Sequence, residues 1–155
     1  MSETTWRVSA MAVADLPVVN IIERQAPSPW SLGQLTEELT CPGALQLVCH
    51  SVSGEHMAGF LMARFIPGEM ELLKIATAQD FQRHGVASLL LQSAITFARQ
   101  QDLTRIYLEL RSQNIPARTL YEKFTFEMTG RRPNYYTAPK DDALCMTLRL
   151  DQKKR

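Results

Sequence analysis

Hydrophobic and polar positions along this chain follow two periods, one typical of helices and one typical of strands. Apolar residues recur at helical spacing over 15–24, where Pro17 suits a first turn and Asp15 can cap the helix. Ser31 can cap a second helix that extends through Leu39. Strand-like runs occupy 7–13, 44–51, 57–65 and 70–77, and the last three are joined by short Gly-containing turns. These three runs therefore predict an antiparallel meander.

The second half of the chain continues with helices and strands in alternation. A helix is expected over 86–100, with a buried stripe of Leu89, Leu90, Ser93, Ala94 and Phe97. Strict alternation over 104–110 predicts a strand that lies parallel to 70–77, because a helix separates the two in sequence. A short helix (116–123), a short strand (124–128) and a closing strand (143–150) follow. The pattern predicts a mixed, mostly antiparallel α+β sheet with helices on both faces.

Length and composition fit one soluble domain. The 155 residues form a single predicted domain, with 1–5 and 151–155 expected to be flexible ends. The net charge of +1 gives no strong field toward nucleic acid or a membrane, and no apolar run approaches the ~20 residues that span a bilayer. The start of the chain resembles no secretion signal, which indicates a cytoplasmic protein. We expect a monomer or weak dimer.

Cysteine and histidine residues give no sign of a metal site or a disulfide framework. The three cysteines are odd in number and scattered, and none forms a C-x-x-C pair. The three histidines have no ligand spacing with them. We therefore expect reduced thiols and no metal.

A polar turn between the strand 70–77 and the helix 86–100 is the first candidate site. The opening turn of a helix has four backbone N–H groups without intrahelical partners, and its dipole favours negative charge. Gly85 and Ala87 leave this turn nearly bare, and Arg83 adds a positive charge. The turn lacks the glycines of a P-loop or a dinucleotide fingerprint. It is either a diphosphate-binding turn or an ordinary junction that binds nothing.

A second candidate site lies at the end of the strand 104–110. Glu109 lies on the face opposite the apolar positions, and alternation alone favours a solvated carboxylate there. Asn114 precedes Pro116 as a helix cap would, and Tyr121 has the spacing of a core residue. Alternatively, parallel strands that splay at their carboxyl ends leave a slot for a ligand. A cofactor in that slot would have Glu109 and Tyr121 facing its reactive end from one side.

Several segments resemble a known family. The turn Gln82-Arg83-His84-Gly85-Val86-Ala87 resembles the Q/R-x-x-G-x-G/A signature of the GNAT superfamily of N-acetyltransferases. Within that superfamily, a wider set of segments is similar to the bacterial ribosomal-protein alanine N-acetyltransferases (RimI type), namely Pro29 to Ser31, 108–114, 120–126, 131–136 and 142–146. The similarity extends over roughly 21–150, nearly the whole chain.

The resemblance implies the GNAT fold, with a splayed parallel strand pair, and acetyl-CoA as co-substrate. It implies Glu109 as general base and Tyr121 as general acid. It assigns the cofactor to Ile75, Ala76, Thr77, Arg83, His84, Gly85, Val86, Ala87, Ser88 and Asn114. The acceptor would be a protein N-terminal amine. Two alternative functions are an acetyltransferase that acts on a small amine and a non-catalytic module that binds acetyl-CoA.

The chain departs from the resembling enzymes at four positions. Lys74 stands in place of the usual Asn, Thr77 in place of Val, and Ala87 in place of the second Gly of the signature. We expect Lys74 to project into the acceptor cleft and to change what enters it. Thr125 replaces a Gly at a turn that tolerates positive φ, so strain is expected there.

Overall fold

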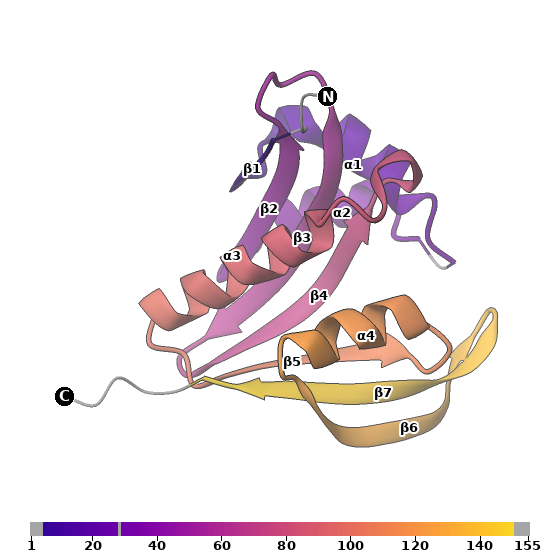
Figure 1. Ribbon diagram of the computed structural model, residues 1–155. Coiled ribbons are helices and arrows are strands. Elements are labelled where there is room, and N and C mark those ends of the chain that lie inside the picture. Colours follow the sequence, from indigo (N-terminus) through magenta and orange to yellow (C-terminus); the bar gives the residue numbers. More distant parts are fainter. Residues whose placement is uncertain (1–4, 28, 151–155) are drawn as a thin grey trace.

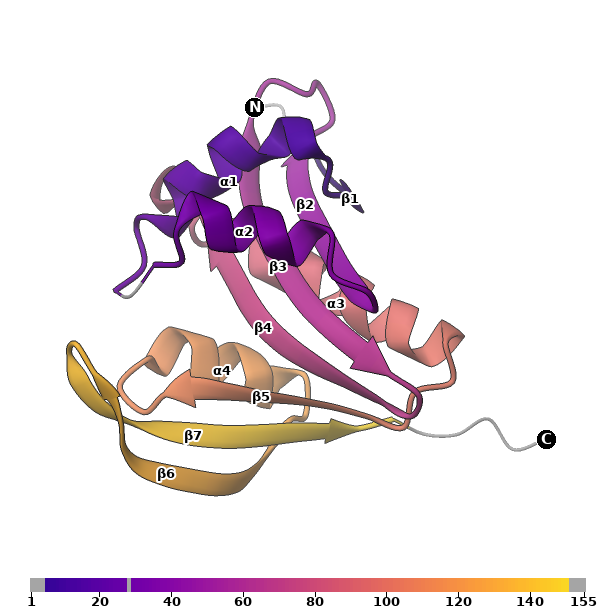
Figure 2. The ribbon, with the colours of Figure 1, turned by 180° about the vertical axis from the view of Figure 1, so that it is seen from behind.

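The computed structural model describes residues 5–27 and 29–150, which form a seven-stranded sheet with helices on both faces (Figures 1 and 2). The sheet order is β1-β2-β3-β4-β5-β7-β6. The strands are β1 (Trp6–Ala10), β2 (Ala44–Ser51), β3 (Met57–Ile66), β4 (Glu69–Thr77), β5 (Arg105–Arg111), β6 (Glu127–Thr137) and β7 (Lys140–Arg149). The helices are α1 (Leu16–Glu23), α2 (Leu32–Leu39), α3 (Val86–Gln100) and α4 (Ile115–Lys123), with short 3-10 turns η1 (Val13–Asp15) and η2 (Gln79–Phe81).

One parallel strand pair interrupts an otherwise antiparallel sheet. β4 and β5 are parallel, and their register extends from Glu69 opposite Arg105 to Leu72 opposite Leu108. β4 continues to Thr77 and β5 to Arg111, so both strands extend beyond their paired segment. Figure 1 shows the two ribbons diverging after this segment. The predicted parallel pair with splayed carboxyl ends is confirmed.

A β-bulge and a hydrogen-bonded turn account for the splay. Met62 of β3 pairs with Lys74, whereas Ala63 pairs with Leu72, so Leu73 is an extra residue in β4. Bulges bend a strand and increase its local twist. At the opposite end of the pair, Thr104 donates to the carbonyl of Gly68 through both its backbone N–H and its hydroxyl. The two strands are therefore joined at one end and bend apart at the other.

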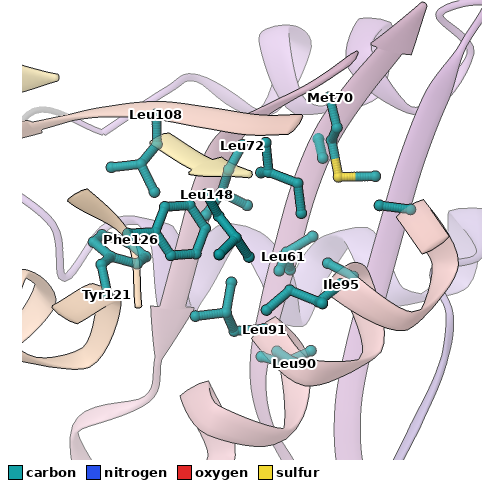
Figure 3. Close-up of a cluster of buried hydrophobic side chains, with 14 of the residues drawn as sticks. Leu61, Met70, Leu72, Leu90, Leu91, Ile95, Leu108, Tyr121, Phe126 and Leu148 are labelled. Carbon is teal, nitrogen blue, oxygen red and sulfur yellow. The ribbon is translucent and has the colours of Figure 1, made fainter. Parts of the chain in front are cut away.

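Two apolar clusters cover the two faces of the sheet. On one face, α3 and α4 pack over residues of β3, β4, β5 and β7, and Figure 3 shows part of this cluster. On the other face, α1 and α2 pack over Val48, Phe60 and Met62. The buried positions of α3 are Val86, Leu90, Leu91, Ala94, Ile95 and Ala98. The predicted stripe is thus wrong at Leu89, which is 41% exposed, because α3 is rotated so that 91, 95 and 98 face the sheet.

Several boundaries differ from the sequence predictions. The first strand ends at Ala10, and 13–15 forms η1 in place of the predicted strand end. The Asp15 carboxylate accepts a bond from the Ala12 backbone N–H and does not cap α1. β6 is longer than the predicted 124–128, and its register with β7 is irregular between Arg132 and Tyr136. Pro133 lies in that stretch, and a proline has no N–H to give to a ladder.

The predicted flexible ends fall mostly outside the described residues. Of them, the structure describes only Thr5, whose carbonyl accepts a hydrogen bond from the Val52 N–H. Between residues 5 and 150, leaving out 28, no helix is long and apolar enough to cross a membrane.

The end of α4 is a Schellman motif with threonine at the position that glycine usually fills. Phe126 N–H donates to the carbonyl of Tyr121, and Thr125 N–H donates to that of Glu122. The Tyr121 and Phe126 rings pack 5.5 Å apart between centroids, which is the apolar contact that accompanies this motif. Thr125 has a φ of 68°, in the left-handed region that is unfavourable for a residue with a Cβ. The strain expected at this position is therefore present.

Replacing Thr125 with glycine should stabilise the protein. Thr125 is exposed, so few contacts are lost, and relief of the left-handed strain exceeds the added entropy of the unfolded chain. We expect Thr125→Gly to raise the free energy of unfolding by about 0.5–1 kcal/mol, measured by urea denaturation. Thr125→Ala, which keeps a Cβ, should change it little. A Gly variant less stable than the Ala variant would contradict this explanation.

Candidate functional site

The turn before α3 presents an uncapped helix start. Gly85 is the N-cap residue with a φ of 78°, and no side chain of the described residues caps α3 there. A Cβ built on Gly85 would meet no atom within 4 Å, so the space before the helix is open. The N–H groups of the first turn therefore face a space that an anion could occupy.

The other residues of this turn divide between backbone and side-chain roles. Arg83 is exposed and also has a positive φ, of 67°. Val86 is 1% exposed and belongs to the core, so it offers only its backbone to a ligand. Ala87 and Ser88 are half-buried in the first turn of α3. The His84 ring packs near Trp6 and Phe81, with centroids 6.5 Å away from each, which holds the turn against β1 and η2.

Gly59 of β3 is a positioning residue that sequence reasoning missed. A Cβ at Gly59 would lie 2.5 Å from the carbonyl oxygen of Ala76 and 2.9 Å from a methyl carbon of Val86. Any other residue would push the start of α3 away from the sheet. An isolated glycine within a strand often marks such a close approach, and this was the available signal.

The last residues of β4 form one edge of the gap between β4 and β5. Ile75, Ala76 and Thr77 pair with β3 on one side, opposite Leu61, Phe60 and Gly59. On the other side the register with β5 has already ended at Leu72. A strand with one unpaired edge can bind an extended, amide-containing ligand as an added strand. The edge of Ile75, Ala76 and Thr77 that faces away from β3 thus has no β5 partner in the register, as their predicted role beside a ligand requires.

Glu109 points to the same face of the sheet as the one on which α1 and α2 pack, although these helices cover other strands. Its neighbours Leu108 and Leu110 point to the opposite face, into the α3 and α4 cluster. An Oε1 oxygen of Glu109 is 3.1 Å from Nη2 of Arg132, and the Glu109 side chain is 24% exposed. A cavity of about 300 Å³ lies beside it, lined also by Tyr107, Cys145 and Arg132. The carboxylate is therefore half-buried and paired, not freely solvated.

Tyr121 lies on the other face of β5. It is 5% exposed and belongs to the same cluster as Leu108, Leu110 and Phe126. Figure 3 shows its ring beside that of Phe126. Burial raises the pKa of its hydroxyl well above the ordinary value, so the phenol keeps its proton at neutral pH. The structure thus places Glu109 and Tyr121 on opposite faces of β5, whereas the sequence analysis had both on one side of the slot.

Asn114 and the cysteines have simple structural roles. The Asn114 side-chain oxygen accepts a hydrogen bond from the Ala117 N–H at 3.2 Å, which confirms the predicted cap of α4. Cys41, Cys49 and Cys145 are free thiols. Burial raises the pKa of the Cys49 thiol to about 11, so this thiol is a poor nucleophile.

Lys74 is occupied by an ion pair that sequence reasoning did not predict. Its Nζ lies 2.5 Å from Oε2 of Glu23, at the end of α1, and 4.6 Å from the centroid of the Trp30 ring. Glu23 is 1% exposed. A glutamate directly after Ile22, on the apolar stripe of α1, was the signal that could have indicated a buried charge.

Comparison with known proteins assigns this arrangement to a family. The model of the acetyltransferase (GNAT) family matches residues 16–126. The chain is 31% identical over 144 residues to the ribosomal protein bS18-alanine N-acetyltransferase of Escherichia coli K12, covering 91% of this chain and 95% of that protein. The corresponding enzyme of Haemophilus influenzae is 30% identical over 147 residues, covering 92% of this chain and 98% of that protein.

Solved structures agree with this assignment. The crystal structure of the ribosomal-protein-S18-alanine N-acetyltransferase from Escherichia coli superposes with a TM-score of 0.88 at 28% identity, covering 97% of both chains. Ard1 from Thermoplasma volcanium shares the fold, with a TM-score of 0.83 at 22% identity over 95% of this chain and 99% of that one. The chain therefore belongs to the acetyltransferase (GNAT) family and is an acetyl-CoA-dependent N-acetyltransferase.

Proposed function

We propose that this enzyme transfers the acetyl group of acetyl-CoA to the N-terminal α-amino group of a ribosomal protein, by direct attack in a ternary complex. The observation that carries the mechanism is the gap between β4 and β5, which has the open helix start at Gly85 near one end and Glu109 on its other strand. The acceptor is inferred from the bS18-alanine N-acetyltransferases, which the chain matches over more than nine-tenths of its length. Such an acceptor implies a cytoplasmic enzyme.

The donor would bind through backbone groups. The diphosphate would lie against the N–H groups of Val86, Ala87 and Ser88, with Arg83 and His84 beside it. The amide-containing arm would extend along the free edge of Ile75, Ala76 and Thr77. The side-chain nitrogen of Asn114 would donate to the same arm, since the oxygen of that side chain caps α4.

The chemistry requires one proton to leave the amine and one to reach sulfur. A protein α-amino group has a pKa of roughly 7.7–8.0, so it loses its proton readily near neutral pH. A carboxylate such as Glu109 can accept that proton, directly or through a water. The neutral nitrogen attacks the thioester carbon, the carbon–sulfur bond breaks, and the departing thiolate takes a proton. Tyr121, which burial keeps protonated, would supply that proton or a hydrogen bond. No covalent intermediate is needed.

Replacing Gly85 with alanine should weaken donor binding. A methyl group there would enter the space assigned to the diphosphate. Gly54 is a matched control, since its φ of 79° is nearly the same and its Cβ would also meet nothing within 4 Å. We expect Gly85→Ala to raise the Kd for acetyl-CoA in calorimetry by about tenfold or more, and Gly54→Ala to leave it unchanged. Equal affinities in the two variants would exclude a phosphate site at Gly85.

Replacing Glu109 with glutamine should slow turnover without loss of donor affinity. Loss of a general base lowers kcat by about 10²–10⁴-fold. Glu69 is the matched control: it lies on the same face, pairs with Arg105 at 3.2 Å, and its side chain is 27% exposed, against 3.1 Å and 24% for Glu109. We expect Glu69→Gln to retain near-normal kcat, and Tyr121→Phe to lower it. Full activity of both Glu109→Gln and Tyr121→Phe on the true acceptor would refute the assigned roles.

The acceptor is tested by labelled acetyl-CoA and mass spectrometry of a cell extract. We expect the label on the N-terminal residue of a ribosomal protein, and faster turnover on a synthetic Ala-starting peptide of that protein than on free amino acids or polyamines. Label on a small amine only, with the peptide inert, would replace the proposed acceptor with a small molecule. The donor and catalytic variants would keep their expected effects in either case.

A further inference from the structure

Two residues from separate segments, Trp30 and Lys74, meet around the buried carboxylate of Glu23 on the α1 and α2 face. Oε2 of Glu23 accepts a hydrogen bond from the Trp30 backbone N–H at 2.8 Å and also lies 2.5 Å from Nζ of Lys74. The Trp30 ring lies over the same ammonium group. We call Glu23, Trp30 and Lys74 the latch. It joins the end of α1 and the segment before α2 to β4.

The latch lies on the same face of the sheet as Glu109, on the opposite side of the gap. Lys74 pairs with Met62, which belongs to the α1 and α2 cluster, so its side chain points to that face. On β5, Tyr107 points to the same face as Glu109, and its hydroxyl donates a hydrogen bond to Glu71 of β4. Lys74 lies directly after the bulge at Leu73, where the two strands begin to separate. Under the proposed function, an amine that enters the gap from this face would have Lys74 on one strand and Glu109 on the other.

The pairing of Lys74 decides what charge an incoming amine meets. An α-ammonium group would be repelled by a free lysine at this place and attracted by a carboxylate. Glu23 neutralises the Lys74 ammonium, and its own burial makes it depend on that ammonium. The two contacts also fix Trp30 next to β4. The contacts that form the latch are made among these three residues and do not include the donor turn at Gly85.

We propose that the latch is a positioning device for the acceptor: it neutralises Lys74 and fixes the wall formed by Trp30, so that the amine is guided toward Glu109. This inference rests on the proposed function of the gap. It assigns to Lys74 a role other than the one expected from the sequence, because the ammonium is held by Glu23 and does not stand free in the cleft.

The test compares Michaelis constants for acceptor and donor in four proteins. Lys74→Met leaves the Glu23 carboxylate without a cationic partner, and Lys74→Arg keeps the charge. Arg64→Met is the matched control, since Arg64 pairs with Glu38, another buried carboxylate, and joins α2 to β3, one strand farther from the gap. We expect Lys74→Met to raise the KM for the acceptor about tenfold, with kcat and the KM for acetyl-CoA within about twofold. Lys74→Arg should restore the acceptor KM, and Arg64→Met should not change it.

Two results would overturn the proposal. One is an unchanged acceptor KM in Lys74→Met, and the other is an equal rise in Arg64→Met, which would indicate a general loss of stability. The acceptor used is the amine that the wild-type enzyme acetylates fastest, peptide or small molecule. Inactivity on the peptide therefore counts against the proposed acceptor, whereas the ratio of KM values between the variants counts for or against the latch.

Discussion

The structure depends on one feature of the sheet: β4 and β5 are hydrogen-bonded at their start and separate at their ends. Thr104 fixes the paired end to the turn at Gly68, and the extra residue Leu73 bends β4 away at the other end. A parallel pair that continued in register would satisfy more backbone groups but would leave no space for a donor. The free edge of β4 thus exists because the bulge ends the pairing there. Apart from Asn114 at the start of α4, the groups assigned to acetyl-CoA binding belong to this edge or to the turn that begins α3.

Two charged groups that flank the gap are paired within the protein. Glu109 on β5 pairs with Arg132 of β6, and Lys74 on β4 pairs with Glu23 of α1. Such charge-assisted pairs fix the orientation of the side chains on both sides of the gap. The donor turn does not depend on paired side chains. Its site is formed by backbone N–H groups and by the lack of a Cβ at Gly85. The two halves of the reaction therefore rely on different parts of the chain.

Local patterns in the sequence were sufficient for most of the fold. The strand 44–51 and the helix 86–100 have the predicted bounds, and the parallel pair followed from the order strand, helix, strand. The cap at Asn114 follows from a rule that involves neighbouring residues only, whereas the positive φ at Thr125 was expected from the resemblance. Errors arose where distant residues decide the outcome. The rotation of α3 that exposes Leu89 depends on how the helix lies on the sheet, and the length of β6 depends on β7.

The candidate site was predictable to a similar degree. The resemblance assigned roles to Glu109, Tyr121 and the turn at Gly85, and the structure brings the turn and both strands to one gap. It could not reveal that Tyr121 approaches from the other face of β5, since that depends on the side of the sheet that α4 covers. Nor could it reveal the partner of Lys74, because Glu23 lies 51 positions earlier in a different helix.

The most direct measurement is a crystal structure of the protein with a non-hydrolysable analogue of acetyl-CoA. The central claim is that the gap holds the donor. We expect the diphosphate within hydrogen-bond distance of the first N–H groups of α3, and the sulfur between β4 and β5 with Glu109 and Tyr121 on its two sides. An analogue bound elsewhere, with the turn at Gly85 unoccupied, would contradict the claim.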